Sequence, residues 1–431
     1  MTGNTPTTPA TPGTPKGRPA APAAAEQFEL LIVGGGLTGM TLACALAGAG
    51  LRVAVVDRQP ADAMVAATYD GRASAIAHAS ARVLQGIGVW SGLREGASPI
   101  RDIRVADGHP VRGISSLFLH YDHRDLGDDP FGYIIENRVL RRALLERAAA
   151  LPSLTLLAPA EISELNRGPN TVDAVLSDGR GLRAALAVAA DGRNSSLRRQ
   201  AKIAVTELRY RQISIVCTVR HERPHAGVAV ELFLPGGPFA MLPMTDNRCN
   251  VVWTERADLA PQYLALDDAA FLDELRLRFG DWLGEISLTG PRFSYPLGVL
   301  HAARYTGGRL ALLGDAAHAI HPIAGQGLNL GLRDVAALAE LVVDSKRLGL
   351  DLAGPSVLDR YERWRRVDNM LLAAVTDGLN RLFSNDIAPV RLARDLGLAA
   401  VDRLPPVKRF LMRHAMGTVG ELPRLVRGEA L

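Results

Sequence analysis

Short apolar runs that end at a glycine or an aspartate recur along the chain. The first is Leu30–Val33; after it come glycines at positions 34, 36 and 39, small residues over Met40–Ala49, and a second run, Val53–Val56, before Asp57. Four-residue apolar runs between turn residues indicate buried strands, and the ten residues between them have the length of a helix. The pattern predicts strand, tight turn, helix and second strand, in that order.

The three glycines and the aspartate have the spacing of a dinucleotide-binding turn. Gly34 permits the turn, Gly36 leaves room for a pyrophosphate at the helix N-terminus, and Gly39 lets helix and strand pack closely. Asp57 can accept a hydrogen bond from a ribose hydroxyl. Because all these features occur in the expected order, we predict that the segment binds NAD or FAD.

Two further apolar strands end at an aspartate. Residues 187–198 (AVAADGRNSSLR) place Asp191 after an apolar run, and residues 309–315 (RLALLGD) end in Gly314 and Asp315. Three such strand ends, each more than a hundred residues from the next, exceed what a simple NAD dehydrogenase needs. They favour a flavin protein.

Residues 212–255 have a different pattern. The apolar stretches ISIVCTV, VAVELFL, GPFAMLPM and CNVVWTE are separated by turn signals at residues 235–237 and 246–247. Stretches of this length between turn residues predict successive strands of one sheet.

Composition narrows the class of protein. The 431 residues are 48% hydrophobic with a net charge of +4, and no block of Lys and Arg is interleaved with aromatics, so nucleic-acid binding is not indicated. The three cysteines, widely spaced in apolar sequence, indicate neither disulfides nor a metal site and fit the cytoplasm. Residues 1–26 are expected to be a disordered tail without a targeting signal, and no apolar run is long enough to span a membrane.

Together, the nucleotide motifs resemble those of the FAD-dependent aromatic hydroxylases typified by para-hydroxybenzoate hydroxylase. Within that superfamily, residues 70–90, 132–147, 321–341 and 376–386 resemble the branch that hydroxylates ubiquinone precursors. The last of these segments, TDGLNRLFSND, is the most specific, because soluble-phenol hydroxylases generally lack it. The resemblance extends from Leu30 to Gly428.

The resemblance implies an α/β fold with discontinuous domains. A Rossmann-like FAD-binding domain of the glutathione-reductase type would comprise residues 27–100, 132–205 and 288–350. An interleaved mixed β-sheet domain for the substrate would comprise residues 101–131 and 206–287. Residues 351–431 would form a C-terminal helical segment.

The resemblance also assigns residues to the cofactor. Asp315 would bond the ribityl chain of FAD and Asp191 would lie near the pyrophosphate. The flavin ring would lie against residues 322–327, where a side chain on Gly325 or Gly327 would collide with it, and the following helix would direct its partial positive charge toward the ring. The expected contacts are Gly34, Gly36, Gly39, Asp57, Arg72, Arg138, Asp191, Gly314, Asp315, Pro322, Gly325, Gln326, Gly327 and Asn329.

Some assignments have a plain structural alternative. Arg72 matches an arginine beside the FAD pyrophosphate but also suits a solvated surface position, and Arg138 suits any amphipathic helix. His318 and His321 lack a third ligand of useful spacing, so we expect no metal. The residues expected to line an apolar substrate pocket, with core packing as the alternative, are Phe239, Met241, Leu242 and Pro243.

As a whole, the resemblance implies a monooxygenase. NAD(P)H would reduce the flavin, and one oxygen atom of O₂ would be transferred to the ring of a polyprenyl phenol; no catalytic nucleophile or base of the protein is expected. A hydroxylase of a small soluble aromatic acid, a flavoprotein reductase of prenyl chains, and a non-catalytic flavin-binding subunit of a membrane-associated complex are the alternatives.

A lipid-soluble substrate requires the protein to approach the bilayer. After two prolines, the segment VKRFLMRHAMG places basic side chains largely opposite an apolar helical face made of Val407, Phe410, Leu411 and Ala415. Such a helix can rest on anionic lipid or on a partner protein, or it can pack on its own domain. We therefore expect a cytoplasmic protein, with peripheral contact to the inner face of the cytoplasmic membrane as one of these alternatives.

Overall fold

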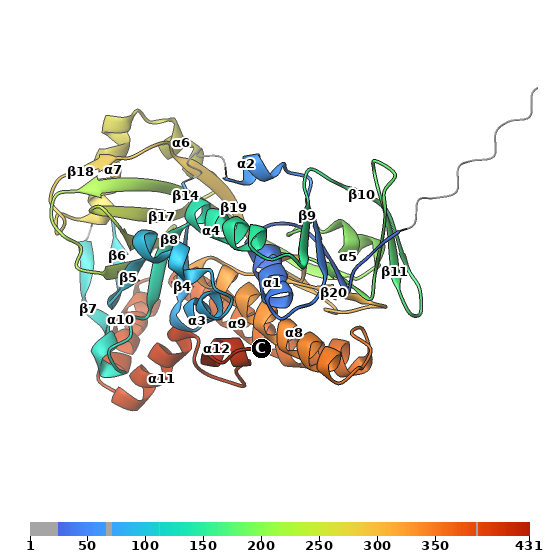
Figure 1. Cartoon of the computed structure of the whole chain (residues 1–431). Coiled ribbons are helices and arrows are strands. Elements are labelled where there is room, and N and C mark those ends of the chain that lie inside the picture. The colour runs from blue at the N-terminus through green and yellow to red at the C-terminus, as the bar shows by residue number, and fades with distance from the viewer. Residues whose placement is uncertain (1–24, 66–70, 112, 385–386) are drawn as a thin grey trace, which may run out of the picture.

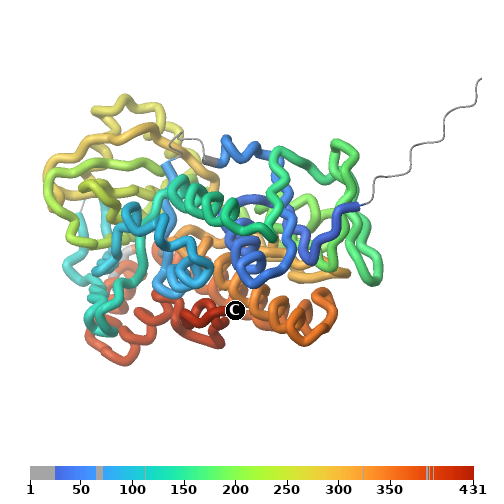
Figure 2. The backbone as a smooth tube through the Cα atoms, viewed as in Figure 1, coloured from blue at the N-terminus to red at the C-terminus, as the bar shows by residue number. Residues whose placement is uncertain are grey.

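The computed structural model describes residues 25–65, 71–111, 113–384 and 387–431. The expected disordered tail lies outside these ranges except for Ala25 and Glu26. Two regions rich in strands lie side by side, and the C-terminal helices, orange to red, extend beneath both of them (Figures 1 and 2). The C-terminal segment therefore joins the two halves of the molecule.

A buried parallel sheet forms the centre of one half. Its strand order is β20 (Leu310–Leu312), β13 (Leu186–Ala189), β2 (Leu30–Val33), β3 (Val53–Val56) and β9 (Leu154–Leu157). Strands covered on both faces are apolar throughout, which explains the short apolar runs of the sequence. Helix α1 (Leu37–Gly48) packs on this sheet, and α4 (Asn137–Ala149) and α8 (Gln326–Arg347) pack on α1 in turn. Helix α1 begins three residues before the expected Met40, because Gly36 is already its N-cap.

Parallel pairing brings the motif residues to one edge of this sheet. The N–H of Gly34 donates to the carbonyl of Val56 (2.9 Å), and the N–H of Leu313 donates to that of Ala189 (2.9 Å). Ligands of open α/β sheets bind at the carboxyl ends of the strands. The three strand ends seen in the sequence therefore form one candidate site. A small sheet of β1 (Glu26–Gln27), β12 (Gly181–Ala184), β11 (Val172–Leu176) and β10 (Ile162–Arg167) lies beside it.

The other half is a large mixed sheet. Its order is β21 (His318–Ala319), β19 (Phe293–Ala302), β14 (Val205–His221), β17 (Arg248–Arg256), β16 (Gly237–Met244), β15 (Val228–Leu234), β6 (Asp102–His109) and β7 (Gly113–Asp122), with β18 (Ile286–Leu288) paired to β14. All four strands expected within residues 212–255 are present. Strand β19, expected in the FAD-binding domain, instead pairs with β14.

The two faces of the large sheet have separate cores. The outer face packs on α6 (Ala260–Ala265) and α7 (Asp268–Phe279). The inner face packs on the small sheet of β4 (Ala73–Ala77), β8 (Gly132–Glu136) and β5 (Ser98–Ile100), and on α9 (Pro355–Phe383), α10 (Ala388–Asp402) and α11 (Pro405–Met416). The remaining helices are α2 (Ala61–Val65), α3 (His78–Gly86), α5 (Ser196–Gln200) and α12 (Arg424–Arg427). The inner face is thus the one directed toward the nucleotide-binding half.

Candidate flavin and substrate site

The turn between β2 and α1 has the geometry that the glycine spacing predicts. Gly34 has a φ of +110°, and a Cβ on Gly39 would lie 2.0 Å from the Gly34 carbonyl oxygen. A Cβ on Gly36, in contrast, would meet nothing within 4 Å. No side chain caps α1 and no acidic residue lies in its first turn. The exposed N–H groups and open space suit a pyrophosphate.

Asp57 follows β3 at the same edge. Its Oδ2 accepts a hydrogen bond from the N–H of Gly35 (2.6 Å) and its Oδ1 accepts one from the N–H of Gln59 (2.7 Å). The carboxylate is therefore fixed beside the glycine turn, and each oxygen has a second lone pair for a hydroxyl donor.

Asp191 stabilises the start of a helix, a role that the sequence did not reveal. Its Oδ2 accepts hydrogen bonds from the N–H (2.7 Å) and the hydroxyl (3.0 Å) of Ser196 at the start of α5. Its Oδ1 is buried and has no partner in the described structure. A buried, unpaired carboxylate oxygen is costly, and it marks a place where a donor from a ligand or water fits.

Asp315 lies in the short 3₁₀ turn Gly314–Ala316 after β20. Its side chain is exposed, yet the protein around it is dense enough that desolvation raises the pKa of its carboxyl, against the opposing charges of His318, Arg193 and Arg72. A carboxyl that is both accessible and desolvated lies in a recess. This arrangement suits a hydrogen bond to a hydroxyl-bearing chain.

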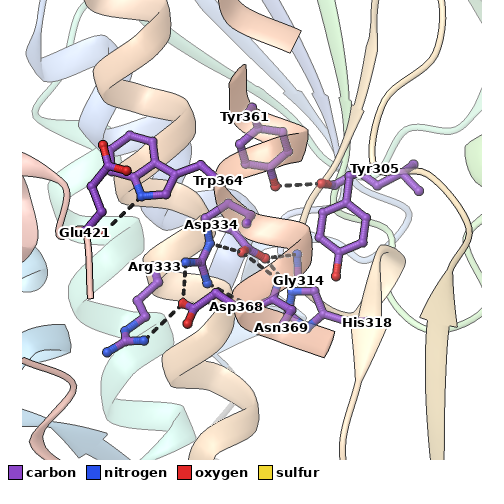
Figure 3. A network of polar contacts seen from close by, with 12 residues as sticks. Tyr305, Gly314, His318, Arg333, Asp334, Tyr361, Trp364, Asp368, Asn369 and Glu421 are labelled. Atoms are coloured by element: carbon purple, nitrogen blue, oxygen red, sulfur yellow. Dashed lines mark hydrogen bonds and ion pairs between the residues drawn. The ribbon is translucent and has the colours of Figure 1, made fainter. Parts of the chain in front are cut away.

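A buried polar network fixes this turn from behind (Figure 3). Asp334 of α8 accepts hydrogen bonds from Arg365 Nε (2.8 Å) and from the Gly314 N–H (3.3 Å), and its Oδ2 lies 2.5 Å from His318 Nε2. Burial alone would raise the pKa of the Asp334 carboxyl, but His318 and Arg365 hold it at about 2. Asn369 Nδ2 also donates to Asp334 (3.2 Å). The network therefore orients the turn that carries Asp315.

The glycines before α8 have two different roles. Gly325 is the N-cap of α8 with φ +61°, and a Cβ there would lie 2.8 Å from the side chain of Ala75. Gly327 would meet nothing within 4 Å. The protein itself thus requires glycine at 325, whereas only Gly327 leaves space for a ligand. Like α1, helix α8 has no side-chain cap and no acidic residue in its first turn.

Asn329 secures the start of α8 to β4. Its Oδ1 accepts from the N–H of Ala77 (2.9 Å), and its Nδ2 donates to the carbonyls of Ala75 (2.8 Å) and Gly325 (3.1 Å). The side chain is buried and committed to the backbone. The structure therefore makes Asn329 a residue that positions the glycine turn. Pro322 and Gln326 flank that turn and are partly buried.

The two expected arginines lie in different surroundings. The guanidinium of Arg72 is 5.4 Å from the ring centre of Tyr295 and close enough to Asp315 to lower the pKa of that carboxyl. Arg138 Nε is 2.5 Å from Glu136 Oε2, and Glu136 also accepts from Arg248 of the large sheet (2.9 Å). The charge of Arg72 thus acts on Asp315 in the cofactor recess, whereas Arg138 takes part in an ion-pair cluster.

The four expected pocket residues do not share a face. Phe239 and Met241 are buried in the outer core beside Trp253, and Pro243, two residues on, pairs with Cys249 of that same core. Leu242, with the opposite orientation, is partly buried in the inner core. Because side chains alternate along a strand, only Leu242 of the four is directed toward the nucleotide-binding half.

His318 and His321 have separate environments. His318 is buried against Asp334, whereas the His321 ring packs on Tyr210 with 5.2 Å between ring centres and has a buried Nε2 without a partner among the described residues. Desolvation lowers the pKa of His321 to about 4. Over the described residues no group of three potential ligands could hold a metal ion.

The segment TDGLNRLF has a contact role that the sequence did not show. The Tyr210 hydroxyl of β14 donates to Asp377 (2.6 Å), and Asn380 Nδ2 donates to Gln212 (3.0 Å). These bonds hold the end of α9 against the large sheet near His321. One signal in the sequence is a polar residue within an otherwise apolar helix. It applies to this segment and also to Asp334 in GLRDVAALAEL.

Comparison with known proteins agrees with this geometry. Residues 27–373 match the family described as FAD binding domain. The chain is 56% identical over 406 residues to the ubiquinone hydroxylase UbiL of Rhodospirillum rubrum, covering 94% of this chain and 93% of that protein. It is 35% identical over 395 residues to the 3-demethoxyubiquinol 3-hydroxylase of Escherichia coli, covering 90% and 98%.

A solved structure supports the fold independently. The p-nitrophenol 4-monooxygenase PnpA from Pseudomonas putida has a TM-score of 0.76 at 21% identity, covering 92% of this chain and 100% of that one. At that identity the likeness concerns the fold alone. The family match and the two relatives together show that the chain belongs to the FAD binding domain family and, within it, to the ubiquinone hydroxylase branch.

Proposed function

We propose that this protein is a FAD-dependent monooxygenase of ubiquinone biosynthesis that uses NAD(P)H and O₂ to hydroxylate the ring of a polyprenyl phenol. The observation that best supports FAD binding is that α1 and α8 both begin without a side-chain cap. Each start has a glycine, Gly36 or Gly327, with open space around it. The names of the two relatives, a ubiquinone hydroxylase and a 3-demethoxyubiquinol 3-hydroxylase, support the substrate class.

The residues of the chain would divide the binding of FAD among them. The start of α1 at Gly36 would hold the pyrophosphate, Asp57 the adenosine ribose, and Asp315 the ribityl chain. The start of α8 at Gly327 would direct about half a positive charge at the flavin ring and so favour its anionic reduced form. When bound, the flavin supplies the redox and oxygen-transfer chemistry, and the protein orients it and excludes water.

The purified protein tests this proposal through its visible spectrum. We expect a flavin band that NADH or NADPH bleaches anaerobically, and faster when a short-chain polyprenyl phenol is present. Hydroxylated phenol should form once air is admitted. Absence of a flavin band after reconstitution with FAD would contradict the cofactor, and product-free reoxidation with the phenol present would contradict the hydroxylase.

We further propose that the C-terminal helices rest on an anionic lipid surface. No helix in the described ranges has the length and hydropathy needed to cross a bilayer. Exposed apolar side chains nevertheless form a stripe along α9, and further exposed apolar residues lie after that helix. The residues are Val367, Leu371, Val375 and Leu382 on α9, and Leu396, Leu404, Val407 and Phe410 after it. A groove of about 520 Å³ on α11 is lined in part by Phe410, Arg409 and Arg413. Exposed apolar and basic side chains together are typical of interfacial binding.

Vesicle flotation tests this surface. The protein should float with phosphatidylglycerol vesicles more than with phosphatidylcholine vesicles, and less at high salt. Phe410→Ser with Val407→Ser should reduce flotation, whereas Leu277→Ser, at an equally exposed apolar position on α7, should not. Equal flotation of all three proteins would contradict the proposal.

A further inference from the structure

A carboxyl lies in the middle of the largely apolar inner face of the large sheet. Glu231 lies in the middle of β15, opposite Ala240 of β16 on one side and Val105 of β6 on the other. Ala229 and Phe233, two residues before and after it, belong to the inner core. Alternation therefore directs Glu231 to the inner face, with Leu242.

This carboxyl has no counter-charge. No hydrogen bond or ion pair joins Glu231 to any other described residue, and desolvation alone raises the pKa of its carboxyl to about 8. Asp107, on the next inward position of β6, differs because Arg394 donates to it (2.7 Å). Burying an acid without a partner costs stability, so its presence requires another explanation.

The surroundings of Glu231 connect to the proposed flavin turn. The inner core contains Ala75, whose side chain is the one that a Cβ on Gly325 would meet. Phe383, near the end of α9, stacks on Phe233 with 3.9 Å between ring centres. Glu231 is only partly buried, as are Leu242 and Val105 on the same face. The carboxyl thus lies within the apolar layer that packs between the sheet and the strand β4 beside the turn before α8.

We propose that Glu231 binds the ring hydroxyl of the phenolic substrate and thereby sets the position of the ring. The inference rests on the proposed function. A carboxyl that is neutral at pH 7 both donates and accepts hydrogen bonds, and so matches a phenol hydroxyl in dry surroundings. The apolar neighbours match the rest of a prenylated ring. An aromatic acid fits less well, because Arg394 on this face already binds Asp107.

Two substitutions at this position separate binding from folding. Glu231→Leu removes both hydrogen-bonding groups, whereas Glu231→Gln keeps a neutral donor and acceptor of the same shape. We expect the Leu variant to raise the KM for a short-chain polyprenyl phenol at least about tenfold and to release more H₂O₂ per NAD(P)H consumed. The Gln variant should stay within about threefold of the parent KM. Neither variant should lower the Tm or the affinity for FAD.

The methyl ether of the same phenol is the matched control ligand. Spectral titration of the bound flavin should show that the parent protein prefers the phenol to the ether, and that the Leu variant does not. Equal binding of the phenol by the parent and Leu proteins would overturn the proposal, as would equal loss with both variants accompanied by a lower Tm. Because this titration measures binding, it decides the role of Glu231 even if the parent protein forms no hydroxylated product.

Discussion

Replacing Asp334 by Asn tests whether the buried network of Figure 3 holds the flavin turn. Asp334 and Arg365 have 0% and 2% side-chain exposure, and the carboxylate accepts bonds from Arg365, Asn369 and the Gly314 N–H. The substitution leaves the Arg365 guanidinium buried beside an amide. Removing one partner of a buried ion pair typically costs about 3–5 kcal/mol of unfolding free energy.

Asp368→Asn is the matched control, because Asp368 is the second carboxylate bound by Arg365 (2.7 Å) but has 36% side-chain exposure. Asp368 also pairs with Arg333 (3.2 Å), and loss of these two partly exposed pairs should together cost only about 1–2 kcal/mol. Urea unfolding of both variants, with and without FAD, measures the difference. We expect Asp334→Asn also to weaken FAD binding, since Gly314 and His318 lose their anchor. Equal costs for the two variants, or an unchanged FAD affinity, would show that Asp334 does not hold the flavin turn.

The remaining predictions concern single residues. Gly36→Ala should fit the protein without FAD, changing its stability by less than about 1 kcal/mol, but should lower FAD affinity at least about tenfold in a fluorescence titration; unchanged affinity would argue against pyrophosphate at α1. Asp315→Ala should weaken FAD binding without lowering the Tm of the flavin-free protein, and a lower Tm would show that the residue is structural. The pKa of His321 is about 4 in the folded protein and about 6.5 in the unfolded chain, so between these values only the unfolded chain takes up the proton. The contribution of His321 to stability is therefore full above pH 6.5 and declines by about 3 kcal/mol as the pH falls to 4. Unfolding of His321→Phe across that range should show a smaller decline, and an equal one would exclude His321 as the cause.

The sequence predicted the nucleotide half well because its signals are local. The apolar runs at residues 30–33 and 53–56 are strands as expected, and Gly34 and Gly39 have the conformation and packing that their spacing demands. The strands of residues 212–255 were also recognisable from their turns. Such features depend on residues that are close together in the sequence, so the amino-acid sequence alone is enough to identify them.

The orientation of side chains in the large sheet was harder to predict, because the face to which a strand residue points depends on the register of the strand. Phe239 and Leu242 look alike as apolar residues, yet the pleat directs them to opposite cores. The separate roles of Gly325 and Gly327 depend on Ala75, some 250 residues away, and so could not be inferred locally. Glu231 was overlooked for the same reason, since one acid in an apolar strand has meaning only when its neighbours across the sheet are known.

Isotopic labelling with ¹⁸O₂ shows directly whether the protein transfers an oxygen atom from O₂ to the phenol ring. The protein, reconstituted with FAD, is supplied with NADH or NADPH and a short-chain polyprenyl phenol under ¹⁸O₂. The mass of the product is then measured by mass spectrometry. We predict a hydroxylated ring that contains one atom of ¹⁸O. A product with oxygen from water, a reduced prenyl chain, or NAD(P)H oxidation that yields only H₂O₂ would contradict it.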